Sequence, residues 1–330
     1  MLKSKLKGMS RELAVLAALI LLIIVFSILD PVYLTPGNMV DIIKQGTING
    51  ILAIGITFAI ISGGIDLSIG CTFAIVIVAV GQLTVVGVPP LVAIVLGGIL
   101  GAIMGSINGI LITKMNLQPF IATLGTMSVY RGLAYVFTGG WPVLGIPDNY
   151  RHVFTTKLFG DVPNSILVLF AIAIVTHIVL SKTRFGNYLY AVGGNEEAAK
   201  LSGVNVDKTK IIGYSICGAC AAFAGMIMLA NLGTGEPASG EGYELDAIAA
   251  AAVGGTRMAG GKGTILGTML GALLLAALKI GMIVIGVQSF WQFVVTGIII
   301  VIAAYFETIQ DKLSAMIYKK QEKAAAAAEK

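Results

Sequence analysis

Acidic residues are scarce inside the apolar runs of this chain, and the few that occur there are the first candidates for chemistry. Asp66 lies in the segment 62–70, which reads Ser-Gly-Gly-Ile-Asp-Leu-Ser-Ile-Gly and joins two apolar runs with hardly any polar spacer. A carboxylate in such surroundings is costly unless it faces protein, water or a helix end. The glycines break the helix and free backbone groups that must be buried or line a cavity. Two roles stay open: Asp66 and Ser68 cap the next helix, or the segment lines a polar path through Ser62, Gly63, Gly64 and Asp66.

A second segment repeats this scheme later in the chain. Residues 239–246 read Ser-Gly-Glu-Gly-Tyr-Glu-Leu-Asp, so Glu244 lies between an aromatic residue and Leu, much as Asp66 lies between Ile and Leu. The first copy follows the second apolar run, and the other follows the seventh. Five spans separate them, so the copies face opposite sides of a membrane. This pattern predicts inverted repeats of five helices with a pathway at their interface.

Polar residues also punctuate the first five apolar runs. The further candidates for a path are Asn108, Gln118, Thr123 and Arg131. Amides and hydroxyls can both donate and accept hydrogen bonds, and they suit a neutral polyol better than an ion.

The sequence offers few residues that could carry out catalysis or bind a metal. Cys217 and Cys220 are spaced as Cys-x-x-Cys, but they lie in an apolar run and lack the further Cys or His ligands that a zinc site needs. An intramembrane enzyme would need a nucleophile and a base in contact, or a metal cluster, and His177 stands alone in its run. We expect no catalytic residue, no metal and no cofactor bound by this chain.

The Gly-rich segment 254–263 resembles a phosphate-binding P-loop at first sight. However, Gly263 stands where Ser or Thr must bind magnesium, and Thr256 stands where the first Gly belongs. No strand is predicted before it. We interpret the segment as a re-entrant turn that continues a short, broken helix over 243–253.

A polar stretch over 181–210 carries a short predicted helix. Asn195 suits its N-cap, Glu196 and Glu197 suit its first turn, and Gly203 closes it after about two turns. The helix is either an ordinary surface helix or a surface on which a membrane subunit docks a soluble motor.

The composition predicts that these residues lie on membrane-spanning helices. Of 330 residues, 57% are hydrophobic and only 12% are charged, and the mean hydropathy is +0.92. A soluble domain needs more charge to cover its surface, which excludes a water-soluble enzyme, a disordered chain and a nucleic-acid binder. Because one crossing takes about 20 apolar residues, we predict an all-α polytopic membrane protein. Its ten or so transmembrane helices cover 13–29, 41–61, 69–86, 91–113, 120–137, 165–181, 211–230, 243–253, 264–285 and 290–306.

The basic residues orient this layout. With ten spans, 17 of the 22 Lys and Arg residues fall on the side that holds both termini, and the positive-inside rule makes that side cytoplasmic. Lys279 lies inside a span near its outer end, where we expect its side chain to snorkel. The predicted domains are a cytoplasmic N-terminus (1–12), a transmembrane domain (13–306) and a cytoplasmic tail (307–330).

Five segments together resemble the permease subunits of bacterial monosaccharide importers of the ATP-binding cassette (ABC) class, the ribose-type family of the branched-chain permease superfamily. They are SGGIDLSIG (62–70), QPFIATLGT (118–126), YAVGGNEEAAKLSGV (190–204), GYELDAIAA (242–250) and GGTRMAGGKG (254–263), in the expected order within 40–305. The resemblance implies a ten-helix permease in the bacterial cytoplasmic membrane. Its implied partners are a second permease copy, cytoplasmic ATPase chains that use ATP and magnesium, and an extracytoplasmic sugar-binding protein.

The resemblance also assigns roles to single residues. Five residues are similar to the ATPase-coupling motif of importer permeases: Glu196, Glu197, Ala198, Ala199 and Gly203. The Leu-Pro ending of the longer consensus is absent from this chain. Asp66 and Glu244 match the family's elbow segments.

We therefore expect a non-catalytic permease subunit that moves a monosaccharide, either ribose or another pentose or hexose. The alternative is a secondary sugar carrier or facilitator that works without an ATPase, because inverted repeats and broken helices occur there too. The coupling-type segment 190–204 favours the importer. The identity of the sugar and the choice between a homodimer and a heterodimer stay open at this stage.

Overall fold

The computed structural model describes residues 2–159, 161–303 and 305. Its elements are α1 (Leu2–Leu29), η1 (Pro31–Leu34), α2 (Pro36–Ile61), α3 (Ile69–Val85), α4 (Pro90–Lys114), α5 (Pro119–Thr138), α6 (Asp148–Thr155), β1 (Lys157–Phe159), β2 (Val162–Pro163), α7 (Ser165–Lys182), α8 (Arg184–Gly194), α9 (Glu196–Leu201), α10 (Val206–Leu232), α11 (Tyr243–Val253) and α12 (Ile265–Val284). A further helix covers Trp291–Ala303. The predicted tail over 307–330 lies outside the described residues.

The all-α class is confirmed. In the described part of the chain, six helices are long and apolar enough to cross a membrane: α1, α2, α4, α7, α10 and α12. α3 and the helix over Trp291–Ala303 are apolar but shorter, and α11 has only 11 residues. Each of the ten predicted segments contains a helix, whereas the number of crossings stays a prediction.

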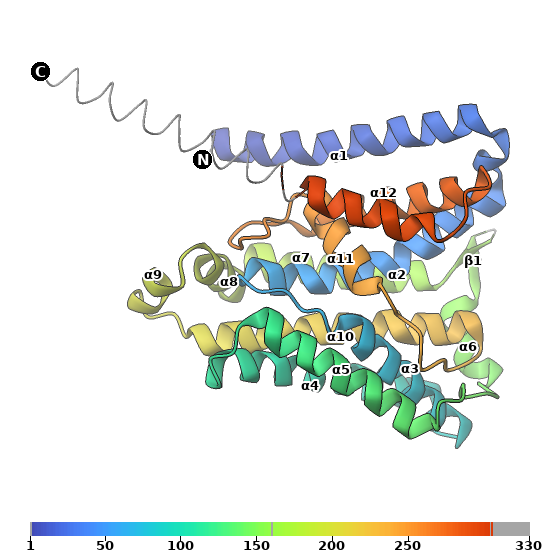
Figure 1. Cartoon of the computed structure of the whole chain (residues 1–330), viewed down its shortest axis with the longest axis horizontal. Helices are drawn as coiled ribbons and strands as arrows, with labels where there is room; N and C mark the ends of the chain where they lie inside the picture. Colours follow the sequence, from blue (N-terminus) through green and yellow to red (C-terminus); the bar gives the residue numbers. More distant parts are fainter. Residues whose placement is uncertain (1, 160, 304, 306–330) are drawn as a thin grey trace, which may run out of the picture.

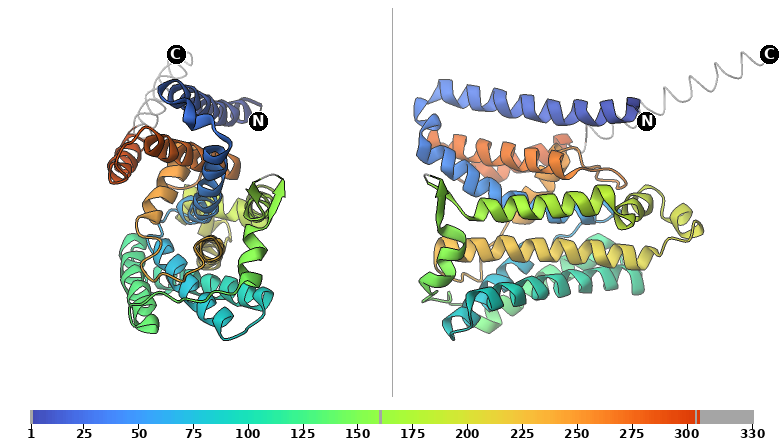
Figure 2. Two further views of the ribbon diagram at one scale, coloured as in Figure 1. Left: turned by 90° about the vertical axis from the view of Figure 1, so that its right-hand side faces the viewer. Right: turned by 180° about the vertical axis from the view of Figure 1, so that it is seen from behind.

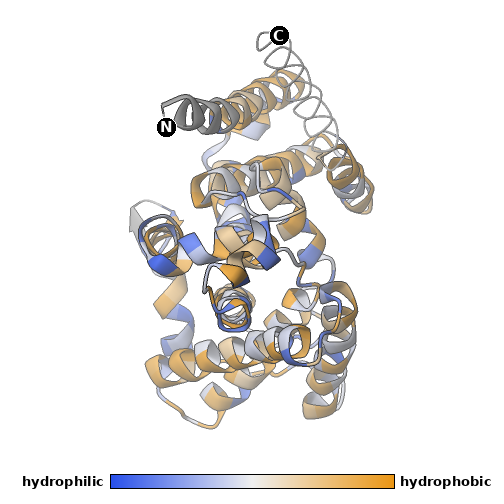
Figure 3. Cartoon of the chain, turned by 90° about the vertical axis from the view of Figure 1, so that its left-hand side faces the viewer, coloured by the Kyte–Doolittle hydropathy of each residue, from blue (hydrophilic) through white to orange (hydrophobic). Residues whose placement is uncertain are grey.

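The helices form a bundle whose two ends differ (Figure 1). One end carries α8 and α9, and the opposite end carries α6, β1 and β2. α2 lies in the interior, because all its residues from Gly46 to Ile61 are buried. α1 lies at the edge of the bundle and packs on α12, as the two further views show (Figure 2). Figure 3 shows hydrophobic residues spread over the helices at the periphery, which suits surroundings of lipid.

α4 and α10 pack closely along a feature that we call the glycine stripe, with backbone contacts at its last three positions. The stripe recurs every four residues on α4 and consists of Gly97, Gly101, Gly105 and Gly109. A Cβ atom on Gly105 would lie 2.0 Å from the carbonyl oxygen of Tyr214, and one on Gly101 would lie 2.4 Å from that of Gly218. Small residues at this spacing let membrane helices approach closely. We treat these two helices as one rigid unit, the α4–α10 pair.

The two short helices α3 and α11 begin inside the bundle rather than at its ends. The chain before α3 comes from the α9 end, where Gly63 lies beside α8. The chain before α11 comes from the opposite end, where Gly235 pairs with Val143. The two first turns meet, because a Cβ atom on Gly70 would lie 2.5 Å from the carboxylate of Glu244 in the first turn of α11. Broken helices that enter from opposite ends fit the inverted arrangement, and the repeat itself stays a prediction.

Candidate functional site

Asp66 lies at the centre of a buried polar network. The residue is 1% exposed. Its Oδ1 accepts hydrogen bonds from the backbone N–H of Ser68 at 2.9 Å and from the Ser68 hydroxyl at 2.7 Å. Asn108 Nδ2, on α4, donates to the two carboxylate oxygens at 3.2 and 3.3 Å. These donors compensate the burial of a carboxylate, as its depth in the bundle requires.

Asn108 connects this network to α5. Its amide nitrogen also donates to the Ser68 hydroxyl at 2.7 Å, and its amide oxygen accepts from Thr126 Oγ1 at 2.6 Å. One turn earlier, Thr123 Oγ1 donates to the carbonyl oxygen of Ile65 at 3.1 Å. We name this set the elbow network; it consists of Asp66, Ser68, Asn108, Thr123 and Thr126. Three of the predicted path residues, Asp66, Asn108 and Thr123, therefore come together, and the network fixes the chain reversal between α2 and α3.

The capping role expected for Ser68 is wrong. Ser68 occupies the N-cap position of α3, but its side chain makes no capping bond, because its hydroxyl donates to Asp66. The Asp66 carboxylate does accept a backbone N–H at the start of α3, as expected for a capping residue. Sequence alone could not separate the two, because both residues suit an N-cap.

The other residues of this segment shape the backbone. Gly63 has a φ of +86°, a left-handed conformation that favours glycine. A Cβ atom on Gly64 would lie 2.2 Å from the Tyr214 hydroxyl. Ser62 is buried, and its hydroxyl donates to the carbonyl oxygen at position 59 at 2.7 Å. Gln118, by contrast, is exposed at the start of α5, where its side chain makes no capping bond.

Arg131 and Glu244 hold the second broken segment. The Arg131 Nη1 donates to the carbonyl oxygens of Pro237 at 2.7 Å and Ser239 at 2.9 Å. These two hydrogen bonds connect α5 to the chain that leads into α11. Glu244 is 8% exposed, and its carboxylate lies beside Gly70 in the first turn of α3. The positive end of the helix dipole stabilises a carboxylate there. Glu244 thus joins α11 to α3 where the two short helices meet.

A buried ion pair near this meeting point was missed at the sequence level. Asp246 on α11 pairs with Lys279 on α12 and also accepts a hydrogen bond from Thr296 at 3.2 Å. Asp246 is 6% exposed and Thr296 is 5% exposed. The expectation that Lys279 snorkels to the interface is wrong, because a buried carboxylate faces it from the neighbouring helix. An ionisable residue inside an apolar span was the available signal, but it did not name the partner.

A buried amide on α2 adds one more candidate for the path. Asn49 is 1% exposed, and within the described residues neither its oxygen nor its nitrogen has a hydrogen-bond partner. Such groups in folded proteins normally find a partner in protein, water or ligand.

The short capped helix predicted after Asn195 is confirmed as α9, and its role in coupling to an ATPase stays a prediction. The Asn195 Oδ1 accepts from the backbone N–H of Ala198 at 2.9 Å, and Glu196 and Glu197 occupy the first turn. Gly203 follows the helix with a φ of +84°. The predicted coupling residues divide by exposure: one is buried, Ala199, and four are exposed, Glu196, Glu197, Ala198 and Gly203.

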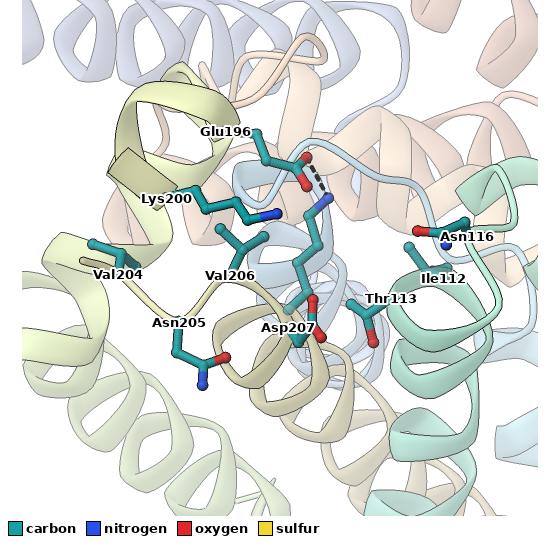
Figure 4. Close-up of a pocket in the computed structure, with 10 residues that line it drawn as sticks. Ile112, Thr113, Asn116, Glu196, Lys200, Val204, Asn205, Val206 and Asp207 are labelled. Atoms are coloured by element: carbon teal, nitrogen blue, oxygen red, sulfur yellow. Dashed lines mark hydrogen bonds and ion pairs between the residues drawn. The ribbon is translucent and has the colours of Figure 1, made fainter. Parts of the chain in front are cut away.

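A cavity of about 340 Å³ lies beside α9, between the last turn of α4 and the first turn of α10 (Figure 4). Two ion pairs border it. Lys210 Nζ lies 2.6 Å from the Glu196 carboxylate, and Lys114 Nζ lies 2.5 Å from that of Asp207. Lys200 reaches into the same space. The lining is therefore polar and mixed in charge, in contrast to the apolar faces of the bundle.

The Gly-rich turn over 254–263 lies at the same end of the bundle. The N–H of Gly261 donates to the carbonyl oxygen of Ile61 at 3.0 Å, and the Tyr190 hydroxyl donates to that of Gly263 at 2.7 Å. Burial raises the pKa of Tyr190 to about 12, so the hydroxyl keeps its proton and remains a donor. The turn therefore packs its backbone on α2 and α8, which agrees with a re-entrant turn rather than a phosphate cradle.

Comparison with known proteins identifies the family. The family described as the permease component of the branched-chain amino acid transport system matches residues 38–304. The chain belongs to this permease family. The match covers α2 to α12 and the helix after them, and so contains both broken segments and α9. No solved structure matches the permease.

Similar proteins cover nearly the whole permease. The ribose import permease protein of Bacillus subtilis is 45% identical over 301 residues, which are 91% of this chain and 94% of that protein. The ribose import permease protein of Escherichia coli is 40% identical over 297 residues, covering 87% and 91%. The D-allose transport system permease protein of Escherichia coli is 34% identical over 296 residues, covering 89% and 90%.

Proposed function

We propose that the protein is the membrane permease subunit of an ABC importer that carries a monosaccharide, with ribose as the first candidate, into a bacterial cell. The observation that supports this most is the 45% identity to a ribose import permease across 91% of the chain. The Asn49 amide is buried without a hydrogen-bond partner among the described residues, and such a group suits a neutral polyol because it offers a donor and an acceptor. Binding of the sugar need not be tight, because a separate delivery protein supplies specificity.

In this assignment the chain is a non-catalytic subunit in the cytoplasmic membrane. Two cytoplasmic ATPase chains use ATP and magnesium, an extracytoplasmic sugar-binding protein delivers the substrate, and a second copy of the permease completes the path. Ten segments within 13–306 cross the membrane as two inverted halves, and both termini lie in the cytoplasm. α1 begins at the end of the bundle that carries α9 (Figure 1), which supports an N-terminus on the same side as the docking helix.

Glu197 and Ala198 form the docking surface for the ATPase, whereas the side chain of the neighbouring Glu196 pairs with Lys210 of α10. Glu197 and Ala198 project from a helix that its cap holds in place, and Gly203 ends it. The test is Glu197→Lys, which places the opposite charge on this surface. We expect the variant to insert normally in the membrane and to lose the ATPase in a pull-down. Normal recovery of the ATPase would contradict the docking role.

Transport itself is tested by reconstitution. The permease, its ATPase and the sugar-binding protein are placed in proteoliposomes, and labelled ribose uptake is measured with and without ATP. We expect uptake only with all three components and ATP. Uptake by the permease alone, without ATP, would favour a secondary carrier, which the pair of broken helices would also fit. Competition by unlabelled allose and galactose then ranks the sugars.

A further inference from the structure

α9 is joined to the rest of the permease at few points. Its buried residue, Ala199, packs with Val192 and Val206 in a small apolar cluster separate from the main core. The ion pair of Glu196 with Lys210 also connects α9 to α10 and spans the cavity between them (Figure 4). The Lys210 side chain is only 13% exposed, whereas the Glu196 side chain is 55% exposed, so the pair is sheltered on the Lys210 side alone.

Lys210 directly precedes a residue at which the backbones of α10 and α4 are in close contact. A Cβ atom on Gly109, the last residue of the glycine stripe, would lie 2.6 Å from the Cα atom of Ile211. The same close packing continues along the helices at Gly105 and Gly101. A displacement of the first turn of α10 is therefore passed directly to α4.

α4 in turn holds the elbow network. Asn108, the neighbour of Gly109, donates to both oxygens of Asp66 and to the Ser68 hydroxyl. Three successive contacts thus lead from α9 to the reversal between α2 and α3. They are Glu196 with Lys210, Ile211 with Gly109, and Asn108 with Asp66.

We propose that the Glu196–Lys210 ion pair passes the movement of α9 to the α4–α10 pair and, through Asn108, to the elbow network. The proposal rests on the proposed function, since an ATPase must move α9. Glu196 and Lys210 are then positioning residues that neither touch the sugar nor hold the ATPase. Without the pair, α9 keeps its cap and its apolar cluster, so the docking surface persists. The contact of Ala199 with Val206 then remains, but the tie at Lys210, beside the close contact with α4, is lost.

The test uses the complete importer in proteoliposomes and measures three quantities: ATPase bound to the permease, ATP hydrolysed and ribose imported. Glu196→Gln and Lys210→Met should each leave ATPase binding unchanged and lower the ribose imported per ATP by about fivefold or more, the scale expected when coupling is lost. Charge exchange, with Glu196→Lys and Lys210→Glu combined, should restore most of this ratio. If the pair only stabilised the fold, the amount of ribose imported per ATP hydrolysed would stay normal.

Lys114→Met is the matched control. Lys114 pairs with Asp207 at 2.5 Å beside the same cavity. Both residues belong to the α4–α10 pair, which the glycine stripe already holds together, so the ratio should not change in this variant.

Three results would overturn the proposal. These are a normal ratio in both single variants, a ratio that the charge exchange does not restore, and loss of ATPase binding in the single variants, which would make Glu196 a docking contact. Failure of the proposed function is recognised separately, because the unmodified importer would then show no ATP-dependent ribose uptake at all.

Discussion

The α9 end of the permease is held mainly by local contacts, whereas the elbow network is held by contacts between helices that lie far apart in the sequence. α9 is a six-residue helix that depends on its own cap and on a small apolar cluster. The elbow network is buried, and its members come from the segment before α3 and from α4 and α5. α9 can therefore be displaced at small cost, whereas the elbow moves only together with the helices that hold it.

This difference suits a transporter in which the ATPase acts on α9 and the membrane pathway opens elsewhere. A docking helix must be able to move when its partner moves, while the residues that control the reversal between α2 and α3 must keep their geometry. The α4–α10 pair lies between them and is the stiffest part of this connection, because its backbones are in contact. Four substitutions test this difference.

The largest effect is expected from Gly105→Leu. A Cβ atom there would meet the carbonyl oxygen of Tyr214 at 2.0 Å, so the α4–α10 pair would have to separate. We expect loss of more than about 4 kcal/mol of stability, seen as loss of folded protein in detergent. The control is Gly98→Ala on the same helix, whose Cβ atom would make an ordinary 3.6 Å contact with Phe223. Normal yield of Gly105→Leu would contradict the rigid pair.

Next is Lys279→Met, which leaves Asp246 buried without its cation. The expected loss is about 3–5 kcal/mol, measured as a lower thermal unfolding temperature in detergent. The double variant Asp246→Asn with Lys279→Met removes both charges and should recover most of the loss. A double variant no more stable than the single one would show that the pair contributes through packing instead.

Asn108→Ala should have a smaller effect that is confined to the elbow network. It removes the amide that donates to Asp66 and accepts from Thr126, at a cost of about 1–3 kcal/mol. Unfolding temperature and ribose uptake should both fall while the ATPase still binds. Asn187→Ala on the exposed surface of α8 serves as the control. Loss of ATPase binding in Asn108→Ala would mean that the two regions are not separate.

The smallest effect is expected from Asn195→Ala. Loss of the N-cap costs α9 about 1 kcal/mol, and hydrogen exchange of the amides over 196–201 should become faster. The amides of α4 should exchange as before. Asn195→Asp keeps a side-chain acceptor at the cap and should leave the exchange unchanged. Equal changes in α4 and α9 would remove the contrast between the two regions.

The sequence predicted the α9 end better than the elbow. Asn195, Glu196, Glu197 and Gly203 lie within a few residues of one another, and cap and turn chemistry act at that range. The partner of Asp66 could not be predicted, because Asn108 lies 42 residues away on another helix. The ion pair of Asp246 with Lys279 escaped prediction for the same reason, and the snorkelling that was expected for Lys279 is wrong.

Local chemistry and hydropathy thus determined which segments are helices, where glycines interrupt them and that the chain needs an apolar surrounding, because these properties depend on residues close in sequence. The resemblance of five motifs to a permease family was readable at the same level. Only the tertiary structure decided that α3 and α11 meet end to end, that the glycine stripe joins α4 to α10, and that Lys210 ties α9 to this pair. The rotation and crossing of each helix decide which side chains meet, and those depend on the packing of the whole bundle.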